Sequence, residues 1–150
     1  ASVEGEIGAM GASAGEAVSA TYTQPEQAKE FVKQTKIDAL ACSFGTVHGL
    51  YSTEPKLDFP RIADIRAQIG IPIVMHGGSG VSDEDFKKCI ANGVRKINYY
   101  TYLAKNGGNA VREHCLKAKE YVYFHDVTLW GIEAMKADVM HAIQIFSNLK

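Results

Sequence analysis

Four short segments rich in β-branched and apolar residues alternate with stretches of helical spacing, and this alternation constrains the fold more than any other feature. The segments are residues 2–7, 37–44, 71–76 and 94–98. Strands that alternate with helices are typical of βαβ units and predict a parallel sheet. Four such units in 150 residues fit either a small doubly wound sheet or one half of a (β/α)8 barrel, which usually needs roughly 250 residues.

The starts of the connecting helices are visible in the sequence. Thr23-Gln24-Pro25-Glu26 has the pattern of a capping box with proline in the first turn. The other predicted helices span residues 58–70, 82–93, 111–118 and 130–146. Residues 8–20 are almost entirely Gly, Ala and Ser, and this composition predicts a mobile loop.

The choice between the two architectures rests on where polar residues gather. A doubly wound nucleotide-binding sheet should carry a glycine fingerprint after its first strand, and residues 5–11 match one only loosely. Polar groups instead follow several strands at their carboxyl ends, where barrel enzymes place their chemistry. The sequence therefore favours the half barrel. The chain opens as a strand, with no initiator Met and no signal-like segment, so we expect it to be the later part of a longer protein.

Charge and hydropathy exclude several classes of partner. The chain has 16 Lys and Arg against 17 Asp and Glu, so it lacks the basic field that nucleic acids and anionic membranes require. Its longest apolar stretch is interrupted by Gly70 and Pro72, which excludes a transmembrane helix. Cys42, Cys89 and Cys115 form no C-x-x-C pair, so we expect free thiols and a cytoplasmic location.

The first predicted strand carries two carboxylates on one face. Side chains alternate along a strand, so Ser2, Glu4 and Glu6 share a face. If that face lies inside a barrel, the carboxylates need a metal ion, a lysine or a shared proton. The alternative is an edge strand with a solvated acidic face, and the sequence leaves both interpretations open.

Two histidines follow predicted strands at their carboxyl ends. His48 and His76 are each followed by glycine, which lets backbone approach a bound ligand closely. A single histidine in such a place is more often a hydrogen-bonded core residue. Two on consecutive strands, together with a carboxylate, could form a zinc site, although the chain has no H-E-x-x-H signature.

The segment Gly77-Gly78-Ser79-Gly80 precedes a capped helix and offers backbone N–H groups to an anion. Short connections between strands and helices are also commonly rich in glycine. At the next strand end, Asn98 and Thr101 could hydrogen-bond a substrate. These features indicate a phosphorylated small molecule as the ligand.

Together these segments resemble the C-terminal half of the class II fructose-1,6-bisphosphate aldolases, a metal-dependent family that includes the tagatose-bisphosphate aldolases. The matching segments lie in the family's order and cover about two-thirds of the chain: residues 2–8, 22–26, 43–51, 76–80 and 93–101. The resemblance implies that residues 1–150 form the C-terminal part of a single (β/α)8 TIM barrel domain with terminal helices. It also implies a cytoplasmic glycolytic enzyme that forms a homodimer or a larger homo-oligomer.

The resemblance assigns roles to individual residues. His48 and His76 would be two of three histidines that bind the catalytic Zn²⁺, with Co²⁺ as a substitute, and Glu6 would belong to the metal environment. Backbone carbonyls near Val47, Gly49 and Gly77 would bind a monovalent cation, Na⁺ or K⁺. The residues implied to bind dihydroxyacetone phosphate are Gly49, Gly77, Gly78, Ser79, Asn98, Tyr99, Tyr100 and Thr101. Zinc would polarise the ketone carbonyl, so no Schiff-base lysine is needed.

This chain departs from the family's pattern at several places. The third histidine and the adjacent catalytic aspartate are expected outside it, and Glu16 is the one candidate for the family's loop glutamate. Tyr100 stands where aspartate is frequent, and residues 123–129 contain His125 and no arginine for a distal phosphate. Fructose and tagatose bisphosphate both remain possible substrates. Two other interpretations are a metal-independent phosphosugar isomerase or epimerase with Glu4 or Glu6 as base, and a non-catalytic sugar-phosphate-binding relative.

Overall fold

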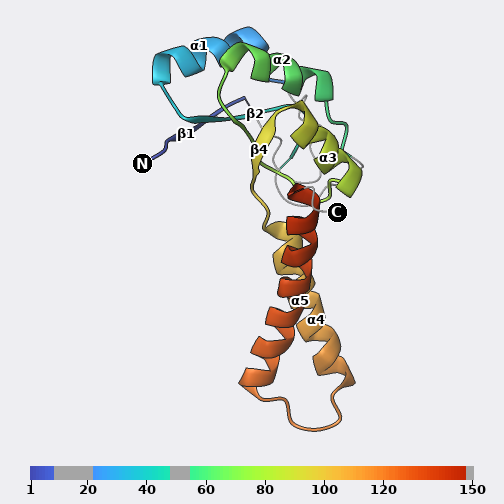
Figure 1. Ribbon diagram of the computed structural model, residues 1–150. Helices are drawn as coiled ribbons and strands as arrows, with labels where there is room; N and C mark the ends of the chain where they lie inside the picture. The colour runs from blue at the N-terminus through green and yellow to red at the C-terminus, as the bar shows by residue number, and fades with distance from the viewer. Residues whose placement is uncertain (9–21, 48–54, 148–150) are drawn as a thin grey trace. The chain divides into compact units, whose positions relative to one another are not determined.

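The structure is a computed structural model, and it describes residues 1–8, 22–47 and 55–147. The chain divides into two compact units, Ala1–Tyr99 and Tyr100–Lys150. Figure 1 shows the elements of each. Within the described residues, no helix is both long and apolar enough to cross a membrane.

The first unit alternates strands and helices throughout. In chain order its elements are β1 (Glu4–Ile7), α1 (Pro25–Thr35), β2 (Ala39–Cys42), α2 (Phe59–Ile69), β3 (Ile73–Met75), α3 (Asp83–Asn92) and β4 (Val94–Ile97). The strands form one sheet in the order β1-β2-β3-β4, and every neighbouring pair is parallel. All four predicted strands are confirmed, with shorter bounds. This βα repeat is an α/β fold and corresponds to half of a (β/α)8 barrel.

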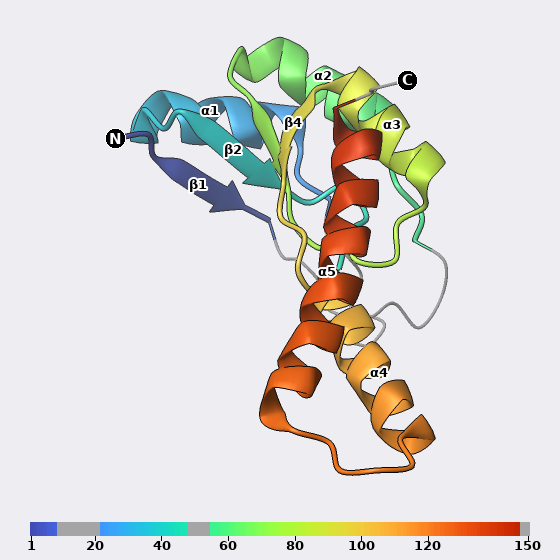
Figure 2. The ribbon, with the colours of Figure 1, turned by 60° about the horizontal axis from the view of Figure 1, so that its bottom comes forward.

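The two faces of the sheet differ in chemistry. Leu40, Ile73 and Met75 are completely buried on the face that the helices cover, and α1 and α2 lie side by side there (Figure 2). Gly5 points to this face, and a Cβ added to it would lie 3.0 Å from the Phe31 ring of α1. The opposite face, here called the carboxylate face, carries Glu4, Glu6, His76, Lys96 and Asn98.

Two of the predicted helix starts in the first unit are confirmed at the expected residue. Asp58 caps α2 by accepting a hydrogen bond from the Arg61 N–H, and Ser82 caps α3 through the Asp85 N–H. For α1 the predicted proline in the first turn is confirmed, but the N-cap is Gln24, one residue after Thr23. The Thr23 hydroxyl instead forms hydrogen bonds with the Ile7 carbonyl and the Ser43 N–H.

Thr23 joins the carboxyl ends of β1 and β2. Its Oγ1 donates to the Ile7 carbonyl oxygen at 3.0 Å and accepts from the Ser43 N–H at 2.9 Å. The side chain is almost fully buried, so these bonds replace lost water contacts. Thr23 therefore acts between strands rather than as a helix cap.

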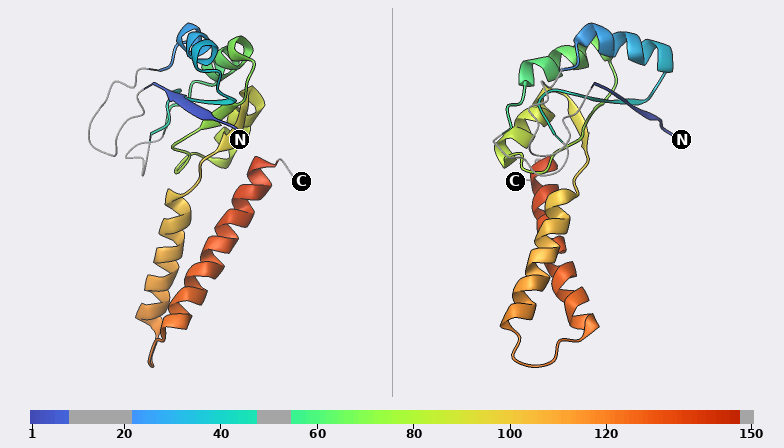
Figure 3. Two further views of the ribbon diagram at one scale, coloured as in Figure 1. Left: turned by 90° about the vertical axis from the view of Figure 1, so that its left-hand side faces the viewer. Right: turned by 180° about the vertical axis from the view of Figure 1, so that it is seen from behind.

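The second unit is a helical hairpin of α4 (Thr101–Lys117) and α5 (Phe124–Phe146), seen clearly in Figure 3. Both helices begin earlier than the predicted residues 111 and 130. Gly107 makes close packing possible, because a Cβ there would lie 2.7 Å from Met135 Cγ on α5. The rings of His114 and Trp130 stack at 4.8 Å between centroids. Apart from Gly8, the predicted mobile loop at residues 8–20 lies outside the described residues.

Candidate active site

The carboxylate face is the concave side of a curved sheet. Glu4 on β1 and Lys96 on β4 lie on strands separated by three strand spacings, about 14 Å in a flat sheet. Their side chains nevertheless meet directly, with 2.7 Å between Lys96 Nζ and Glu4 Oε2. Such a contact requires curvature toward this face, as in a barrel. The structure thus gives Glu4 a lysine partner, while β1 is an edge strand of the described sheet on which Glu4 and Glu6 are exposed, so features of both interpretations of the acidic strand are present.

The sheet register brings these residues into line. Glu6 pairs with Ala41, Ala41 with Val74, and Val74 with Lys96. Residues paired across neighbouring strands point to the same face, and so do residues two apart along one strand. Glu4, His76 and Asn98 therefore join Glu6 and Lys96 on the carboxylate face. Alanines at positions 39 and 41 of the intervening strand leave room for the long side chains on either side.

His76 lies between the two carboxylates of β1. It directly follows β3, and its side chain is 14% exposed. Its Nε2 is 2.9 Å from Glu4 Oε1, which is a good hydrogen bond, and its Nδ1 is 3.4 Å from Glu6 Oε2, which is a longer contact. Both ring nitrogens therefore face a carboxylate oxygen.

Three influences act on the pKa of Glu4. Desolvation by burial is the largest and raises it, but hydrogen bonds and charge from Lys96 and His76 together outweigh that effect. The net result is a pKa below its ordinary value of 4.5. Glu4 is therefore an ionised hydrogen-bond acceptor at neutral pH.

Lys96 was not among the residues predicted for the site. Its Nζ donates to Asn98 Oδ1 at 2.8 Å as well as to Glu4. The Asn98 N–H donates to the Met75 carbonyl oxygen at 2.9 Å, which anchors the segment after β4 to β3. A signal was present in the sequence, because Lys96 lies two residues before Asn98 and shares its face of the strand.

The glycine-rich turn after His76 lies against the segment after β2. Gly77 has φ +67°, and a Cβ there would lie only 2.2 Å from the Val47 carbonyl oxygen. Gly78 is also close-packed, because a Cβ on it would lie 3.2 Å from the Phe86 ring of α3. Ser79 is buried, with 4% of its surface exposed. The structure thus brings together Val47 and Gly77, two of the three backbone groups predicted to bind a cation.

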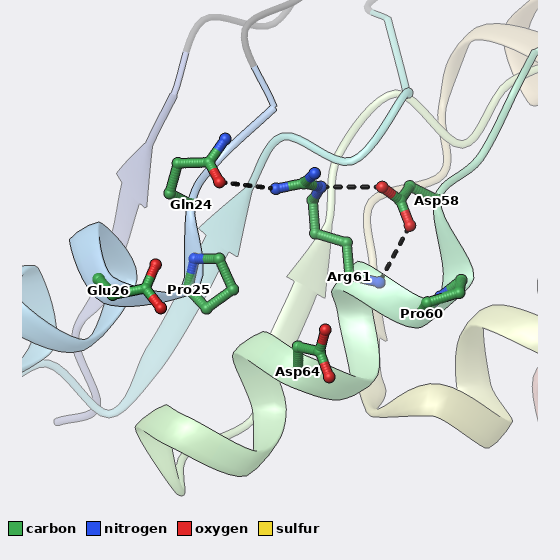
Figure 4. Close-up of a pocket in the computed structure, with 7 residues that line it drawn as sticks. All are labelled: Gln24, Pro25, Glu26, Asp58, Pro60, Arg61 and Asp64. Carbon is green, nitrogen blue, oxygen red and sulfur yellow. Dashed lines mark hydrogen bonds and ion pairs between the residues drawn. The ribbon is translucent and has the colours of Figure 1, made fainter.

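A separate cavity of about 390 Å³ opens where α1 and α2 begin (Figure 4). Arg61 lines it and donates to Asp58 Oδ2 at 2.9 Å, to Gln24 Oε1 at 3.2 Å and to the Thr23 carbonyl oxygen at 3.1 Å. These bonds link the starts of the two helices. The cavity contains none of the residues predicted for the site.

Residues 1–149 match the family model described as fructose-bisphosphate aldolase class-II. The chain belongs to this family.

Two solved aldolase structures share the fold. The YdjI aldolase from Escherichia coli K12 is 34% identical, with a TM-score of 0.80 over 97% of this chain and 49% of that one. The fructose-bisphosphate aldolase from Campylobacter jejuni is 25% identical, with a TM-score of 0.74 over 97% of this chain and 51% of that one. The chain thus spans about half the length of these aldolases.

Class II aldolases are generally metal-dependent, and one pair of donors here has the spacing of two ligands on a metal ion. Ligands about 2.0–2.1 Å from a tetrahedral zinc ion lie about 3.4 Å from one another. The distance from His76 Nδ1 to Glu6 Oε2 is 3.4 Å, with the other ring nitrogen engaged by Glu4. Among the described residues, no group of three or more His, Cys, Asp and Glu has the arrangement of a complete metal site.

The remaining predicted residues of this class II aldolase chain fall into three groups. Three of them lie outside the described residues: Glu16, His48 and Gly49. Tyr100 and Thr101 belong to the second unit, where Tyr100 precedes α4 with 72% of its surface exposed and Thr101 is the first residue of that helix. Tyr99 is the last residue of the first unit and follows Asn98.

Proposed function

We propose that the complete protein is a zinc-dependent class II ketose-bisphosphate aldolase. It reversibly cleaves fructose 1,6-bisphosphate to dihydroxyacetone phosphate and glyceraldehyde 3-phosphate, as a cytoplasmic glycolytic homodimer or larger homo-oligomer. Residues 1–150 are the C-terminal part of its single (β/α)8 domain with terminal helices. The observation that carries this proposal is the placement of His76 between Glu4 and Glu6, on the concave face of the sheet in a chain of this family.

His48, His76 and Glu6 are the residues of this chain proposed for the metal environment. The third histidine and the catalytic aspartate are expected outside the chain. Zinc, when bound, supplies a Lewis acid that polarises the ketone carbonyl of the substrate, and Co²⁺ can substitute for it. Glu6 faces Nδ1 of His76, so these two donors define one side of the metal environment.

The glycine-rich turn is the proposed site for the phosphate of dihydroxyacetone phosphate. It leads into α3, whose N-terminus and backbone N–H groups favour an anion. Ser79 adds a hydroxyl in this buried turn. The proposed substrate-binding residues are Gly49, Gly77, Gly78, Ser79, Asn98, Tyr99, Tyr100 and Thr101.

Two residues have supporting parts in this proposal. Asn98 is oriented by the bond from Lys96, which leaves its side-chain amide N–H groups as donors for a substrate hydroxyl. The Val47 and Gly77 backbones, which lie against each other, are proposed to bind Na⁺ or K⁺ together with Gly49. Such a cation would fix the turn that receives the phosphate.

The contacts of Glu4 weaken the alternative of a metal-independent isomerase that uses this residue as its base. A general base works best with a pKa near the working pH. The pKa of Glu4 is instead lowered, and both of its oxygens are engaged by cationic or N–H donors. Glu4 is better suited to orient His76 than to abstract a proton from a substrate.

The test is aldol cleavage by the purified complete protein, followed through the release of dihydroxyacetone phosphate in a coupled dehydrogenase assay. Fructose and tagatose 1,6-bisphosphate are offered in parallel, before chelation, after chelation, and after zinc or cobalt is returned. Cleavage of the fructose substrate that depends on the metal supports the proposal. Preference for the tagatose substrate would change the identity of the proposed sugar substrate and leave the rest of the proposal in place. Failure of the zinc-loaded protein to cleave either sugar would overturn the proposal and favour a binding protein or an isomerase.

A further inference from the structure

We propose that Lys96 is a positioning residue that acts through Asn98 and determines specificity. It holds the amide of Asn98 so that only N–H groups face a ligand, and the site therefore selects a ligand oxygen that accepts hydrogen bonds at this point. This inference rests on the proposed function, in which Asn98 binds dihydroxyacetone phosphate. It adds a requirement on the chemistry of the ligand, and it assigns a role to a lysine that the proposed reaction does not otherwise use.

The backbone of Asn98 is anchored, but the backbone does not orient the side-chain amide. The Asn98 N–H donates to the Met75 carbonyl oxygen at 2.9 Å, which ties the residue to β3. The terminal torsion of an asparagine side chain is broad and roughly two-fold, so the amide oxygen and the amide nitrogen can exchange places. A neighbouring group must therefore decide which of the two faces a ligand.

Lys96 is the neighbour that decides the orientation of this amide. Its Nζ lies 2.8 Å from Oδ1 of Asn98. An ammonium group has three donors and no acceptor, so it pairs only with the amide oxygen. The opposite orientation would place the amide N–H groups against a cation. Because Oδ1 and Nδ2 diverge from the same carbon atom, Nδ2 is left facing away from Lys96.

The order of the two residues along the chain shows which side of Asn98 remains open. Lys96 belongs to β4, and Asn98 follows that strand two positions later on the same face of the sheet. Barrel enzymes bind their ligands at the carboxyl ends of the strands. Lys96 thus contacts Asn98 from the amino-terminal side, opposite to the end where a ligand binds. Asn98 is exposed, and no other described residue accepts a hydrogen bond from its Nδ2.

Lys96 can orient the amide only while its own flexible side chain is held. Oε2 of Glu4 on β1 accepts from Nζ at 2.7 Å, so the ammonium group is fixed between Glu4 and Asn98. Charge-assisted bonds of this kind are short and strong. The side chain of Lys96 is 53% exposed, and the contact with Glu4 keeps the ammonium group over the sheet instead of in water.

The resulting contact on the ligand side can only donate hydrogen bonds. Nδ2 carries two N–H groups, and a ligand atom beside them must supply a lone pair. A hydroxyl or carbonyl oxygen of a sugar phosphate meets this requirement, whereas an ammonium group in its place does not. A site built to hydrogen-bond an oxygen discriminates strongly against analogues that leave its polar groups unpaired.

The test measures binding of dihydroxyacetone phosphate to the zinc-loaded complete protein by isothermal titration calorimetry. Lys96→Met and Asn98→Ala are compared singly and combined. Lys88→Met is the matched control, because Lys88 also has two acidic partners, Asp85 at 3.2 Å and Glu84 at 3.7 Å, but on the surface of α3. Asn98→Asp replaces the donors with an acceptor of similar shape, and Lys96→Arg supplies a different cationic donor.

We expect Lys96→Met to weaken binding about 10-fold or more, the usual effect of losing a hydrogen bond to a charged group, and Lys96→Arg to restore most of the affinity. In the Asn98→Ala background Lys96→Met should have no further effect, because Lys96 acts through the amide. Asn98→Asp should bind more weakly than Asn98→Ala, since its carboxylate only accepts. Lys88→Met should bind as the unaltered protein does.

A second measurement needs neither ligand nor metal. In protein labelled with ¹⁵N at asparagine, the signal that disappears in Asn98→Ala identifies the side-chain NH₂ group of Asn98. A cation at the amide oxygen strengthens the partial double bond between carbon and nitrogen. Rotation of this NH₂ group should therefore be slower in the unaltered protein and in Lys88→Met than in Lys96→Met.

Three results would overturn the inference. The first is equal weakening of binding by Lys96→Met with and without the Asn98 amide, the second is undiminished binding by Asn98→Asp, and the third is an NH₂ rotation rate that Lys96→Met leaves unchanged. If Lys96→Met does not fold, the result for Asn98→Asp decides the question. Failure of the unaltered protein to bind dihydroxyacetone phosphate would instead overturn the proposed function, and the rotation rates would still show whether Lys96 orients the amide.

Discussion

Lys96 Nζ and Glu4 Oε2 lie 2.7 Å apart although 92 positions separate the two residues in the sequence. They occupy the first and last strands of a four-stranded sheet. The contact therefore reports the curvature of the sheet and at the same time orients the carboxylate that His76 contacts. The curvature of the sheet and the orientation of Glu4 in the candidate site therefore both involve this one contact.

The Thr23 hydroxyl should contribute measurably to stability. Thr23→Val keeps the shape of the side chain but removes the bonds to the Ile7 carbonyl and the Ser43 N–H. A buried backbone group left without a partner costs about 1–3 kcal/mol. Urea unfolding of the complete protein should show a loss of this size, with a smaller loss for Thr23→Ser, which retains the hydroxyl. Equal losses in the two variants would show that packing and not hydrogen bonding matters here.

Gly77 and Gly70 offer a matched pair for separating steric contact from backbone strain. Gly70 has φ +72° with open space around it, whereas Gly77 has φ +67° with the Val47 carbonyl 2.2 Å from any added Cβ. Gly70→Ala should cost about 1–2 kcal/mol for its left-handed backbone. Gly77→Ala should cost clearly more, because backbone must also move. Denaturant unfolding measures both, and similar costs would contradict the close approach of Gly77 to Val47.

The cysteines should differ sharply in reactivity. Burial raises the pKa of Cys42 to about 12, and burial together with the charge of Asp85 raises the pKa of Cys89 to about 12, from an ordinary 9.0. Cys115 is exposed. At pH 8, Cys115→Ser should remove one rapidly reacting thiol from the complete protein in a colorimetric thiol assay. A fast phase that persists unchanged in this variant would contradict the exposure of Cys115.

The raised pKa values of Cys42 and Cys89 also predict a dependence of stability on pH. Below pH 9.0 the thiols are protonated in both the folded and unfolded states, so their contribution is fully present. Above it the unfolded state ionises first, and stability is lost as the pH rises toward about 12. Unfolding curves between pH 8 and pH 11 should show this decline, and a flat profile would contradict it.

Local patterns predicted most of the first unit. Asp58 and Ser82 were identified as helix starts because a cap is read from residues a few positions apart. Thr23 was misassigned because its partners lie 16 and 20 residues away, where local pattern gives no information. The predicted start of α4, residue 111, is too late because Gly107 and Gly108 weaken the helical pattern in the sequence. In the structure, packing of Gly107 against Met135 supports the helix at these positions.

The residues of the candidate site could largely be predicted from the sequence. The contacts between them could be predicted less well. The position of His76 after a strand and the shared face of Glu4 and Glu6 follow from the period of a strand. The pairing of Glu4 with Lys96 depends on register and curvature across the sheet, which no local spacing encodes. The sequence therefore predicts a lysine as one possible partner of the carboxylates, but it does not identify Lys96 as that lysine.

The metal content of the complete protein tests the central claim most directly. Elemental analysis after zinc loading is compared among the unaltered protein, His48→Ala, His76→Ala and a control, His125→Ala, whose side chain is 73% exposed on α5. We predict about one zinc ion per chain in the unaltered protein and the control, and loss of zinc in both other variants. Full retention of zinc in His48→Ala and His76→Ala would contradict the proposal that these two histidines bind the metal.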